Sequence, residues 1–413
     1  MSSLLISNIK QLVLAEDAHR TAPVCGPGMS RLPMLDNAFL LIENGRIAGF
    51  GPMAHCPERA GKTVDATGRF VLPSWCDSHT HLVFAESREE EWVNRIKGLS
   101  YEEIANRGGG ILNSAKKLRE MPEEQLYEHA LRRLGEVRSY GTGLIEIKSG
   151  YGLTVESELK MLRVIRRLKE TSNMGIVATF LGAHSVPAEF RKGNRQGYID
   201  LIINDMLPQI AGEGLADYID VFCEKVAFSV AETEQILEAG ARYGLKPKIH
   251  VNQFYCMGGI AAAVKHGAVS VDHLEVVADE DVEALNGSST IATLLPSAPF
   301  FLNDHIPPAR KLIDAGLPVA LATDYNPGTS PSGRMPFVVS LSCIQMKMLP
   351  EEAINAATLN GAFALEQGVE YGSFARGKVA NFFITRPMPS LAYLPYAFGS
   401  DLVERTFIRG QEN

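Results

Sequence analysis

The spacing of apolar residues along the chain changes near residue 70. Before this point the pattern is typical of β-strands: residues 4–14 form one strand-like segment, and residues 38–42 lead into 46–50 through the hairpin signal Glu43-Asn44-Gly45. After it, short apolar runs alternate with longer stretches of helical spacing, as in repeated βα units. The pattern therefore predicts a small β domain followed by a parallel α/β domain.

Eight short apolar runs make up the strand signal of the α/β region, and eight parallel strands close a barrel. The runs lie at residues 70–76, 144–147, 176–181, 218–222, 248–251, 269–271, 290–295 and 319–322. The segments between them have helical spacing; from residue 159 to 168, for example, a leucine or isoleucine recurs at every third position. We therefore expect a (β/α)8 TIM barrel with an outer ring of amphipathic helices.

The carboxyl end of the chain returns to β structure. After a helical stretch at residues 350–367, strand patterns occur at 378–385 and 402–408, and no helix is predicted between them. Neither end of the chain alone offers many strands to bury a core, so the two ends are expected to pair. We predict a TIM-barrel domain at residues 71–369 and a composite β-sandwich domain built from residues 1–70 and 370–413.

The composition narrows the classes of partner. The chain has 413 residues, 46% of them hydrophobic, and 40 Lys+Arg against 48 Asp+Glu give a net charge of −8, which disfavours binding to nucleic acid or to an anionic membrane. No apolar run approaches the roughly 20 residues of a membrane span, and the N-terminus lacks the basic segment of a signal peptide. We expect a cytoplasmic protein. Six cysteines without a Cys-x-x-Cys pair disfavour a disulfide framework or a thiolate zinc site.

Polar residues with metal-binding side chains follow several of the predicted strands. In a parallel barrel, catalytic groups lie at the carboxyl ends of the strands. Five of the ten histidines and one aspartate stand at such ends: His79, His81, His184, His250, His273 and Asp324. Scattered surface placement would not favour this distribution, so the strand ends are the predicted site.

A metal centre is predicted from four of these residues. His79 and His81 are two positions apart, so on an extended strand their imidazoles point to the same face. Together with His250 and Asp324 they form a nitrogen and oxygen donor set that suits one divalent ion, Zn²⁺ or Fe²⁺, with room for a water. Coordination lowers the pKa of water from 15.7 to about 7, which produces a hydroxide nucleophile at neutral pH.

The chain resembles the metal-dependent amidohydrolases, which are marked by His-x-His after strand one, His after strands five and six, and Asp after strand eight. Within them it is most similar to the imidazolonepropionases. The similar segments are His79-Thr80-His81 with Arg88 after it, Gly108-Gly109-Gly110-Ile111, and residues 146–153, 181–184 and 324–329. The resemblance covers nearly the whole chain and implies hydrolysis of the cyclic amide 4-imidazolone-5-propanoate to N-formimidoyl-L-glutamate in histidine degradation.

The resemblance also implies roles for residues around the metal. His273 would stabilise the oxyanion formed by attack on the ring carbonyl. Asp324 would bind the metal and also carry a proton from water to the departing ring nitrogen. Gln253 stands at a catalytic and substrate-binding position where many members have Glu, although Gln cannot accept a proton. Tyr151 and His184 would contact the imidazolone ring and place its carbonyl.

The small-molecule substrate and its product carry carboxylates that need cationic or N–H partners. Arg88 is the candidate for the propanoate tail, because a planar guanidinium can hold a carboxylate through two parallel hydrogen bonds. Ring opening creates a second carboxylate. Asn326, Gly328 and Thr329 form a turn that could offer backbone N–H groups and a hydroxyl to that group.

Three alternatives stay open at this point. Lys225 follows the fourth run, where dihydroorotase-like members carry a carbamylated lysine that bridges two metals, with His250 and His273 both as ligands. A deaminase of purine-like rings shares the metal set, although Arg88 and the 326–329 turn favour a carboxylate substrate. A barrel that binds a metal and a ligand without turnover is the third. A homodimer is compatible with the resemblance, since many amidohydrolases pair.

Overall fold

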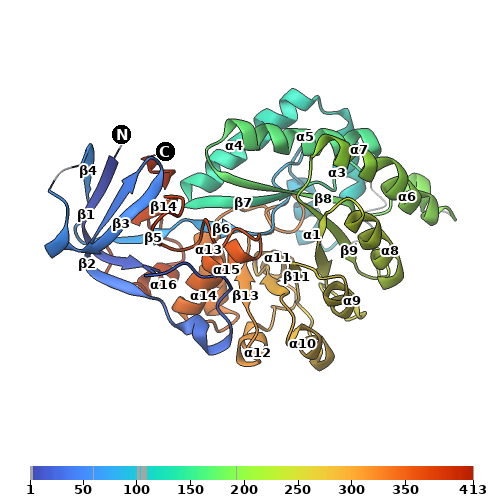
Figure 1. Cartoon of the computed structure of the whole chain (residues 1–413). Helices are drawn as coiled ribbons and strands as arrows, with labels where there is room; N and C mark the ends of the chain where they lie inside the picture. Colours follow the sequence, from blue (N-terminus) through green and yellow to red (C-terminus); the bar gives the residue numbers. More distant parts are fainter. Residues whose placement is uncertain (1–2, 59, 100–102, 104–108, 192, 413) are drawn as a thin grey trace.

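Two β-sheets organise the computed structural model, which describes residues 3–58, 60–99, 103, 109–191 and 193–412 (Figure 1). One sheet is built from both ends of the chain and the other from its middle, with eight strands each among the described residues. Both chain ends lie at the first sheet, where the blue and red strands meet in Figure 1. The predicted combination of a parallel barrel with a β domain from both chain ends is confirmed.

The terminal sheet has the strand order β16-β15-β14-β5-β1-β2-β3, and β4 pairs with β1. Its strands are β1 Ser3–Val13, β2 Met34–Glu43, β3 Arg46–Pro52, β4 Lys62–Asp65, β5 Phe70–Pro73, β14 Phe382–Thr385, β15 Val403–Ile408 and β16 Gln411–Glu412. Asn44 and Gly45 have φ values of 52° and 77°, the left-handed conformation that the predicted hairpin turn requires. Phe382 from one end of the chain packs with Ile6 and Leu40 from the other, so the two ends share one apolar core.

The barrel strands follow one another in chain order and pair in parallel. They are β6 Trp75–Asp77, β7 Thr142–Lys148, β8 Gly175–Ala183, β9 Tyr218–Cys223, β10 Lys246–Val251, β11 Ser270–His273, β12 Ile291–Leu294 and β13 Val319–Leu321. Helices cover the outside of this sheet (Figure 1).

The seam between the first and last barrel strands is closed by the residues that follow them. Within the described residues no ladder joins β13 to β6, but a bridge pairs Thr80 with Tyr325. The Asp324 N–H donates to the His79 carbonyl at 3.0 Å, and the His81 N–H donates to the Tyr325 carbonyl at 2.9 Å. Backbone hydrogen bonds at the seam therefore bring Asp324 next to the His-x-His motif.

The helices occupy the predicted intervals. They are α1 Glu89–Ile96, α3 Ile111–Glu120, α4 Glu123–Ser139, α5 Val155–Thr171, α6 Arg195–Leu201, α7 Leu207–Glu213, α8 Val230–Ala241, α9 Gly259–Lys265, α10 Asp279–Leu285, α11 Ser297–Leu302, α12 Ala309–Asp314, α13 Met335–Ile344, α14 Pro350–Ala357, α15 Leu359–Phe363 and α16 Tyr393–Tyr396, with short 3₁₀ or π turns at η1 Gly26–Ser30, η2 Met53–His55, η3 Ala188–Phe190 and η4 Ile202–Met206. In α5 the apolar positions predicted to face inward are buried. None of the helices in the described ranges is long and apolar enough to cross a bilayer.

Two details of the predicted elements are wrong. The apolar run at residues 70–76 is not one barrel strand: its first part, β5, pairs with β1 and β14 in the terminal sheet, and only β6 enters the barrel. A continuous apolar run does not reveal which sheet each half joins. The short helix α16 lies between β14 and β15, where no helix was predicted, because four residues are too few to show a helical period.

Candidate functional site

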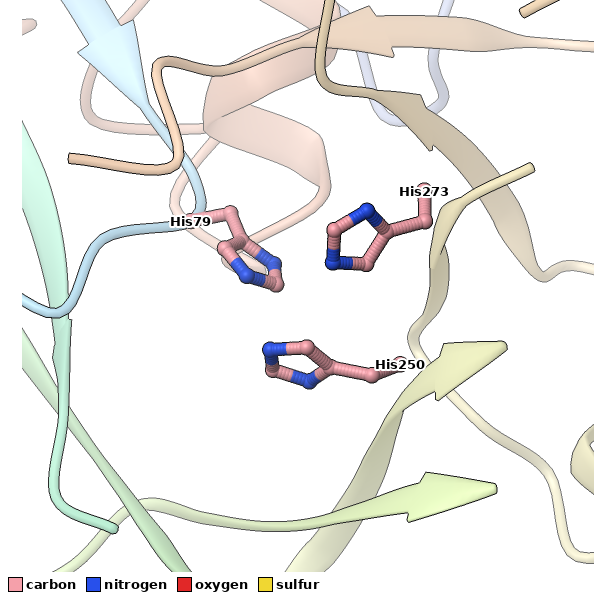
Figure 2. Close-up of side chains that lie close together, drawn as sticks. All are labelled: His79, His250 and His273. Atoms are coloured by element: carbon pink, nitrogen blue, oxygen red, sulfur yellow. The ribbon is translucent and has the colours of Figure 1, made fainter. Parts of the chain in front are cut away.

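The four predicted metal ligands converge at the carboxyl ends of the barrel strands. His81 Nε2 lies 3.2 Å from His250 Nε2. Asp324 Oδ1 lies 3.6 Å from His79 Nε2 and 3.5 Å from His81 Nε2. All four residues are buried, and Figure 2 shows the imidazoles of His79 and His250 turned toward one another beside His273. Ligand atoms of His79, His81 and Asp324 lie within 4.8 Å of one another, and His250 belongs to two overlapping groups of the same kind, with His79 and His273 and with His81 and His184.

Two aspartates, one on β9 and one on β11, orient the histidine rings. His79 Nδ1 donates to Asp272 Oδ2 at 2.6 Å, and His250 Nδ1 donates to Asp220 Oδ2 at 2.8 Å. Since the Nδ1 atoms carry the protons, the Nε2 lone pairs face the site, as in carboxylate–histidine–metal arrangements. Among the described residues, the buried His79 Nε2 atom has no hydrogen-bond partner. This unpaired acceptor and the donor set around it fit a divalent cation.

The protonation states of these groups suit metal binding. Burial, followed by the charges of neighbouring cations, lowers the pKa of His79 and of His250 well below the usual histidine value. The imidazoles are therefore neutral at neutral pH. Burial raises the pKa of the Asp324 carboxyl to about 7, and a bound cation would lower this pKa again because it favours the carboxylate.

His273 differs from the other histidines in charge. Burial alone would lower its pKa, but Glu275, whose Oε1 lies 3.1 Å from His273 Nδ1, raises the pKa of His273 to about 9. The ring of His273 lies 5.3 Å from that of His250 between centroids. Its φ of 92° is unusual for a residue with a side chain and is a form of strain that concentrates at functional sites. The raised pKa favours the protonated form of His273, beside imidazoles whose pKa values are lowered. A ring nitrogen of His273 also lies within 4.8 Å of ligand atoms of His79 and His250.

A pocket with a volume of about 650 Å³ opens above these residues. Most of the residues predicted for substrate and catalysis line it: His81, Arg88, Tyr151, His184, His250, Gln253, His273, Asp324, Asn326 and Thr329. His184 stacks on His81 with centroids 5.1 Å apart, and the Tyr151 ring lies 5.4 Å from that of His184. Burial lowers the pKa of His184 to about 4, so this ring is neutral as well.

Arg88 is fixed in place by its neighbours. Its Nε and Nη2 donate to Glu91 Oε2 at 2.9 and 2.6 Å, and Glu91 Oε1 accepts from the Gly110 N–H at 2.9 Å. Gly110 belongs to the glycine segment of the sequence prediction, whereas Gly108 lies outside the described residues. A Cβ on Gly328 would lie only 2.3 Å from Arg88 Nη1. Gly328 therefore makes room for the guanidinium at the edge of the pocket.

The turn after β13 uses its N–H groups internally. The Gly328 and Thr329 N–H groups both donate to Asn326 Oδ1 at 2.8 Å. Asn326 Nδ2 donates to the Asp324 carbonyl at 2.7 Å and to Thr329 Oγ1 at 2.8 Å. The two N–H groups expected to meet a carboxylate are therefore already engaged, and an anion would have to share them. The observed bonds also tie Asp324 to the turn.

Lys225 lies apart from the predicted ligands. It is exposed, and its Nζ stands 3.9 Å from the centroid of the Tyr255 ring. This placement disfavours a carbamylated lysine that bridges two metals.

The sequence analysis assigned no role to several charged residues of the site. They lie inside the barrel strands and are fully buried: Glu146, Lys148, Asp220, Lys248 and Asp272. All five stand within or next to apolar runs that were predicted to be buried strands, and a charge in such a run is the signal that could have found them. Glu158 on α5 was missed too; it accepts from the Gly150, Gly152 and Leu153 N–H groups and so holds the loop of Tyr151.

Comparisons with known proteins identify the family of the chain. The model of the amidohydrolase family matches residues 70–412. The imidazolonepropionase of Christiangramia forsetii is 55% identical over 410 residues, which cover 99% of both chains, and that of Flavobacterium psychrophilum is 57% identical over 98% of this chain and 99% of its own. The crystal structure of an adenosine deaminase from Xanthomonas campestris with bound zinc has a TM-score of 0.70 at 16% identity, covering 100% of this chain and 92% of that one, a likeness of fold alone. The chain therefore belongs to the amidohydrolase family, among the imidazolonepropionases.

Proposed function

We propose that this enzyme uses water to open the ring of 4-imidazolone-5-propanoate, giving N-formimidoyl-L-glutamate, as a step of histidine degradation. The observation that carries the proposal is the cluster of overlapping histidine and aspartate groups, among them His79-His81-Asp324, beside a pocket that Arg88 also lines. The near full-length similarity to imidazolonepropionases supports the choice of substrate.

One divalent ion, Zn²⁺ or Fe²⁺, held by these four residues would lower the pKa of a water to about 7 and polarise the ring carbonyl. The neutral imidazoles and the buried carboxylate are the protonation states that such an ion requires. His79 and His250 keep their Nε2 atoms turned to the site because Asp272 and Asp220 accept from their Nδ1 atoms.

Asp324 transfers the proton, and His273 stabilises the negative charge that develops in the reaction. Asp324 Oδ2 accepts a proton from the attacking water and passes it to the ring nitrogen as the C–N bond breaks. His273, kept protonated by Glu275, donates a hydrogen bond to the oxyanion of the tetrahedral intermediate. Gln253 contacts the ring through its amide and takes no proton, since an amide has no basic group at neutral pH.

The carboxylate of the substrate binds at the edge of the pocket, where Arg88 lies. Arg88 presents its guanidinium to the propanoate tail while Glu91 holds it from behind. Tyr151 and His184 pack against the imidazolone ring and align its carbonyl with the ligand cluster. The carboxylate formed by ring opening meets the turn of Asn326, Gly328 and Thr329, chiefly through the Thr329 hydroxyl, since the N–H groups of the turn are shared with Asn326.

The test is a turnover assay with metal counting. We expect the purified protein, loaded with Zn²⁺ or Fe²⁺, to remove the absorbance of freshly prepared imidazolonepropionate and to contain close to one metal per chain by mass spectrometry. Protein treated with a chelator is the control and is expected to be inactive until metal is restored. A metal-loaded protein that leaves imidazolonepropionate intact but deaminates guanine or adenosine would replace this function by the deaminase alternative.

The same proposal extends to the compartment, the binding partners and the assembly of the enzyme. A small, soluble metabolite as substrate fits a cytoplasmic enzyme without nucleic-acid or membrane partners, in keeping with the net negative charge of the chain. A homodimer is the proposed assembly. Light scattering of the purified protein checks it.

A further inference from the structure

A buried group of charged side chains lies beneath the predicted ligands, inside the barrel. It consists of three carboxylates and two lysines from neighbouring strands, all without solvent exposure: Glu146, Lys148, Asp220, Lys248 and Asp272. The group retains one net negative charge. Burying such charges is costly, and removing one partner strongly destabilises the folded protein because the other charge is left unpaired. The contacts of each lysine therefore indicate which carboxylates it keeps in place.

Lys148 joins the two aspartates that orient the histidines. Its Nζ lies 2.9 Å from Asp220 Oδ2 and 3.7 Å from Asp272 Oδ2, and 2.9 Å from Glu146 Oε1. The same two aspartate oxygens accept from the ligand rings: Asp220 Oδ2 from His250, and Asp272 Oδ2 from His79. One ammonium group thus bonds closely to the aspartate that accepts from His250 and lies within ion-pair distance of the aspartate that accepts from His79.

The second lysine of the group makes different contacts. Lys248 Nζ donates to Ser270 Oγ at 2.7 Å and to the Ala364 carbonyl at 3.1 Å. It stays 3.9 Å from both Asp272 Oδ2 and Glu146 Oε2, and within the described part of the chain it forms no ion pair with Asp220. The two lysines share burial and charge, but only Lys148 reaches both aspartates that bind ligand histidines.

We propose that Lys148 is a positioning residue of the metal centre, which holds Asp220 and Asp272 where each keeps the Nε2 atom of its histidine directed at the ion. This inference rests on the proposed metal centre. Without the ammonium group, two like-charged carboxylates would repel one another across the barrel and turn away from the rings. Loss of partners that orient metal ligands weakens metal affinity by about 10- to 100-fold.

The affinity of the protein for Zn²⁺, measured by competition with a coloured chelator, tests the proposal together with the visible spectrum of the Co²⁺-loaded protein. In Lys148→Met we expect Zn²⁺ affinity to fall by about 10- to 100-fold and the Co²⁺ bands to shift as the ligand geometry changes. Lys248→Met should lower affinity less. Lys378→Met is the matched control, because it removes another buried lysine, bonded to Gly368 O, Tyr371 O and Ser373 Oγ in a different part of the molecule, and should leave affinity and spectrum unchanged.

A double variant distinguishes a positioning role of Lys148 from an effect of the buried net charge or of misfolding. Glu146→Gln combined with Lys148→Met removes one carboxylate and one ammonium group, so the net charge of the buried group is unchanged. Weakened Zn²⁺ binding and an altered Co²⁺ spectrum in this folded variant support the positioning role. Wild-type affinity and spectrum in either Lys148 variant would overturn it. A wild-type protein that takes up no metal would instead contradict the proposed function, so the two failures are distinguishable.

Discussion

The proposed metal end of the site, at His79, His81, His250 and Asp324, and its proposed carboxylate end, at Arg88, are built in different ways. At the metal end, His79 follows β6, His250 lies on β10 and Asp324 follows β13, so the groups are carried by the sheet and its seam. At the carboxylate end, Arg88 directly precedes α1 and is held by Glu91, three residues further along the chain. Coordination needs several atoms fixed from different directions, and a barrel supplies this, whereas loops on the same scaffold adapt more easily to a given substrate.

The largest expected loss of activity comes from a substitution at the metal end. Asp324→Asn keeps the size of the side chain but removes the group that would accept the proton and contributes a negative charge to the ion. We expect kcat to fall by at least about 1000-fold, the upper part of the range for loss of a general base. Steady-state rates with the metal content measured on the same sample check this. A variant that keeps near-normal kcat would exclude Asp324 from proton transfer.

The next largest effect comes from a substitution that changes only the carboxylate end. Arg88→Ala should raise KM and lower kcat/KM by an amount equivalent to about 2–5 kcal/mol, as expected when one partner of a buried charge pair is lost. Zn²⁺ affinity should not change, since Arg88 has no contact with the predicted ligands. Arg132→Ala, which removes an exposed arginine of α4, is the control. An unchanged KM in Arg88→Ala would remove this residue from the substrate site.

A smaller substitution tests the carboxylate end without removing a charge. In Gly328→Ala the new methyl group meets Arg88 Nη1, and because Glu91 holds the other side of the guanidinium, Arg88 must shift. Misplacement of a binding group by about 1 Å can cost up to about 100-fold, so we expect a higher KM with stability near that of the wild type. Gly212→Ala, where the added methyl group meets no atom within 4 Å, should behave as the wild type. Equal KM values in the two variants would argue against a close packing of Gly328 on Arg88.

The two ends of the site also differ in how far the sequence could predict them. The clustering of the proposed ligands was predictable because apolar runs mark strands, and His79, His81, His250 and Asp324 stand at their carboxyl ends. The acceptors Asp220 and Asp272 were not, because their role depends on reach between strands that are distant along the chain. Likewise, spacing alone says nothing of the contact between Arg88 and Gly328 or of the N–H groups that Asn326 occupies. Residue type and strand position predict chemistry, whereas side-chain hydrogen bonding has to be observed.

The smallest expected effect concerns Glu158, the carboxylate that anchors the Tyr151 loop. Burial raises the pKa of Glu158 above its usual value, although three backbone N–H groups and Ser149 oppose the shift. The folded state therefore binds this proton more tightly than the unfolded state does, so the stability that Glu158 contributes is greatest in acid and declines as pH rises through the folded pKa. Glu158→Gln cannot ionise. We expect the advantage of the wild type in unfolding free energy to shrink with rising pH from about 4.5 upward, by at most about 1.4 kcal/mol per pH unit.

Thermal unfolding of both metal-saturated proteins over this pH range measures the difference, because titrations that the two share cancel. A changing difference would show that the stability of the Tyr151 loop depends on pH through Glu158. Curves that stay parallel would show that Glu158 titrates alike in the folded and unfolded chains, and the Tyr151 loop would then owe its position to packing alone.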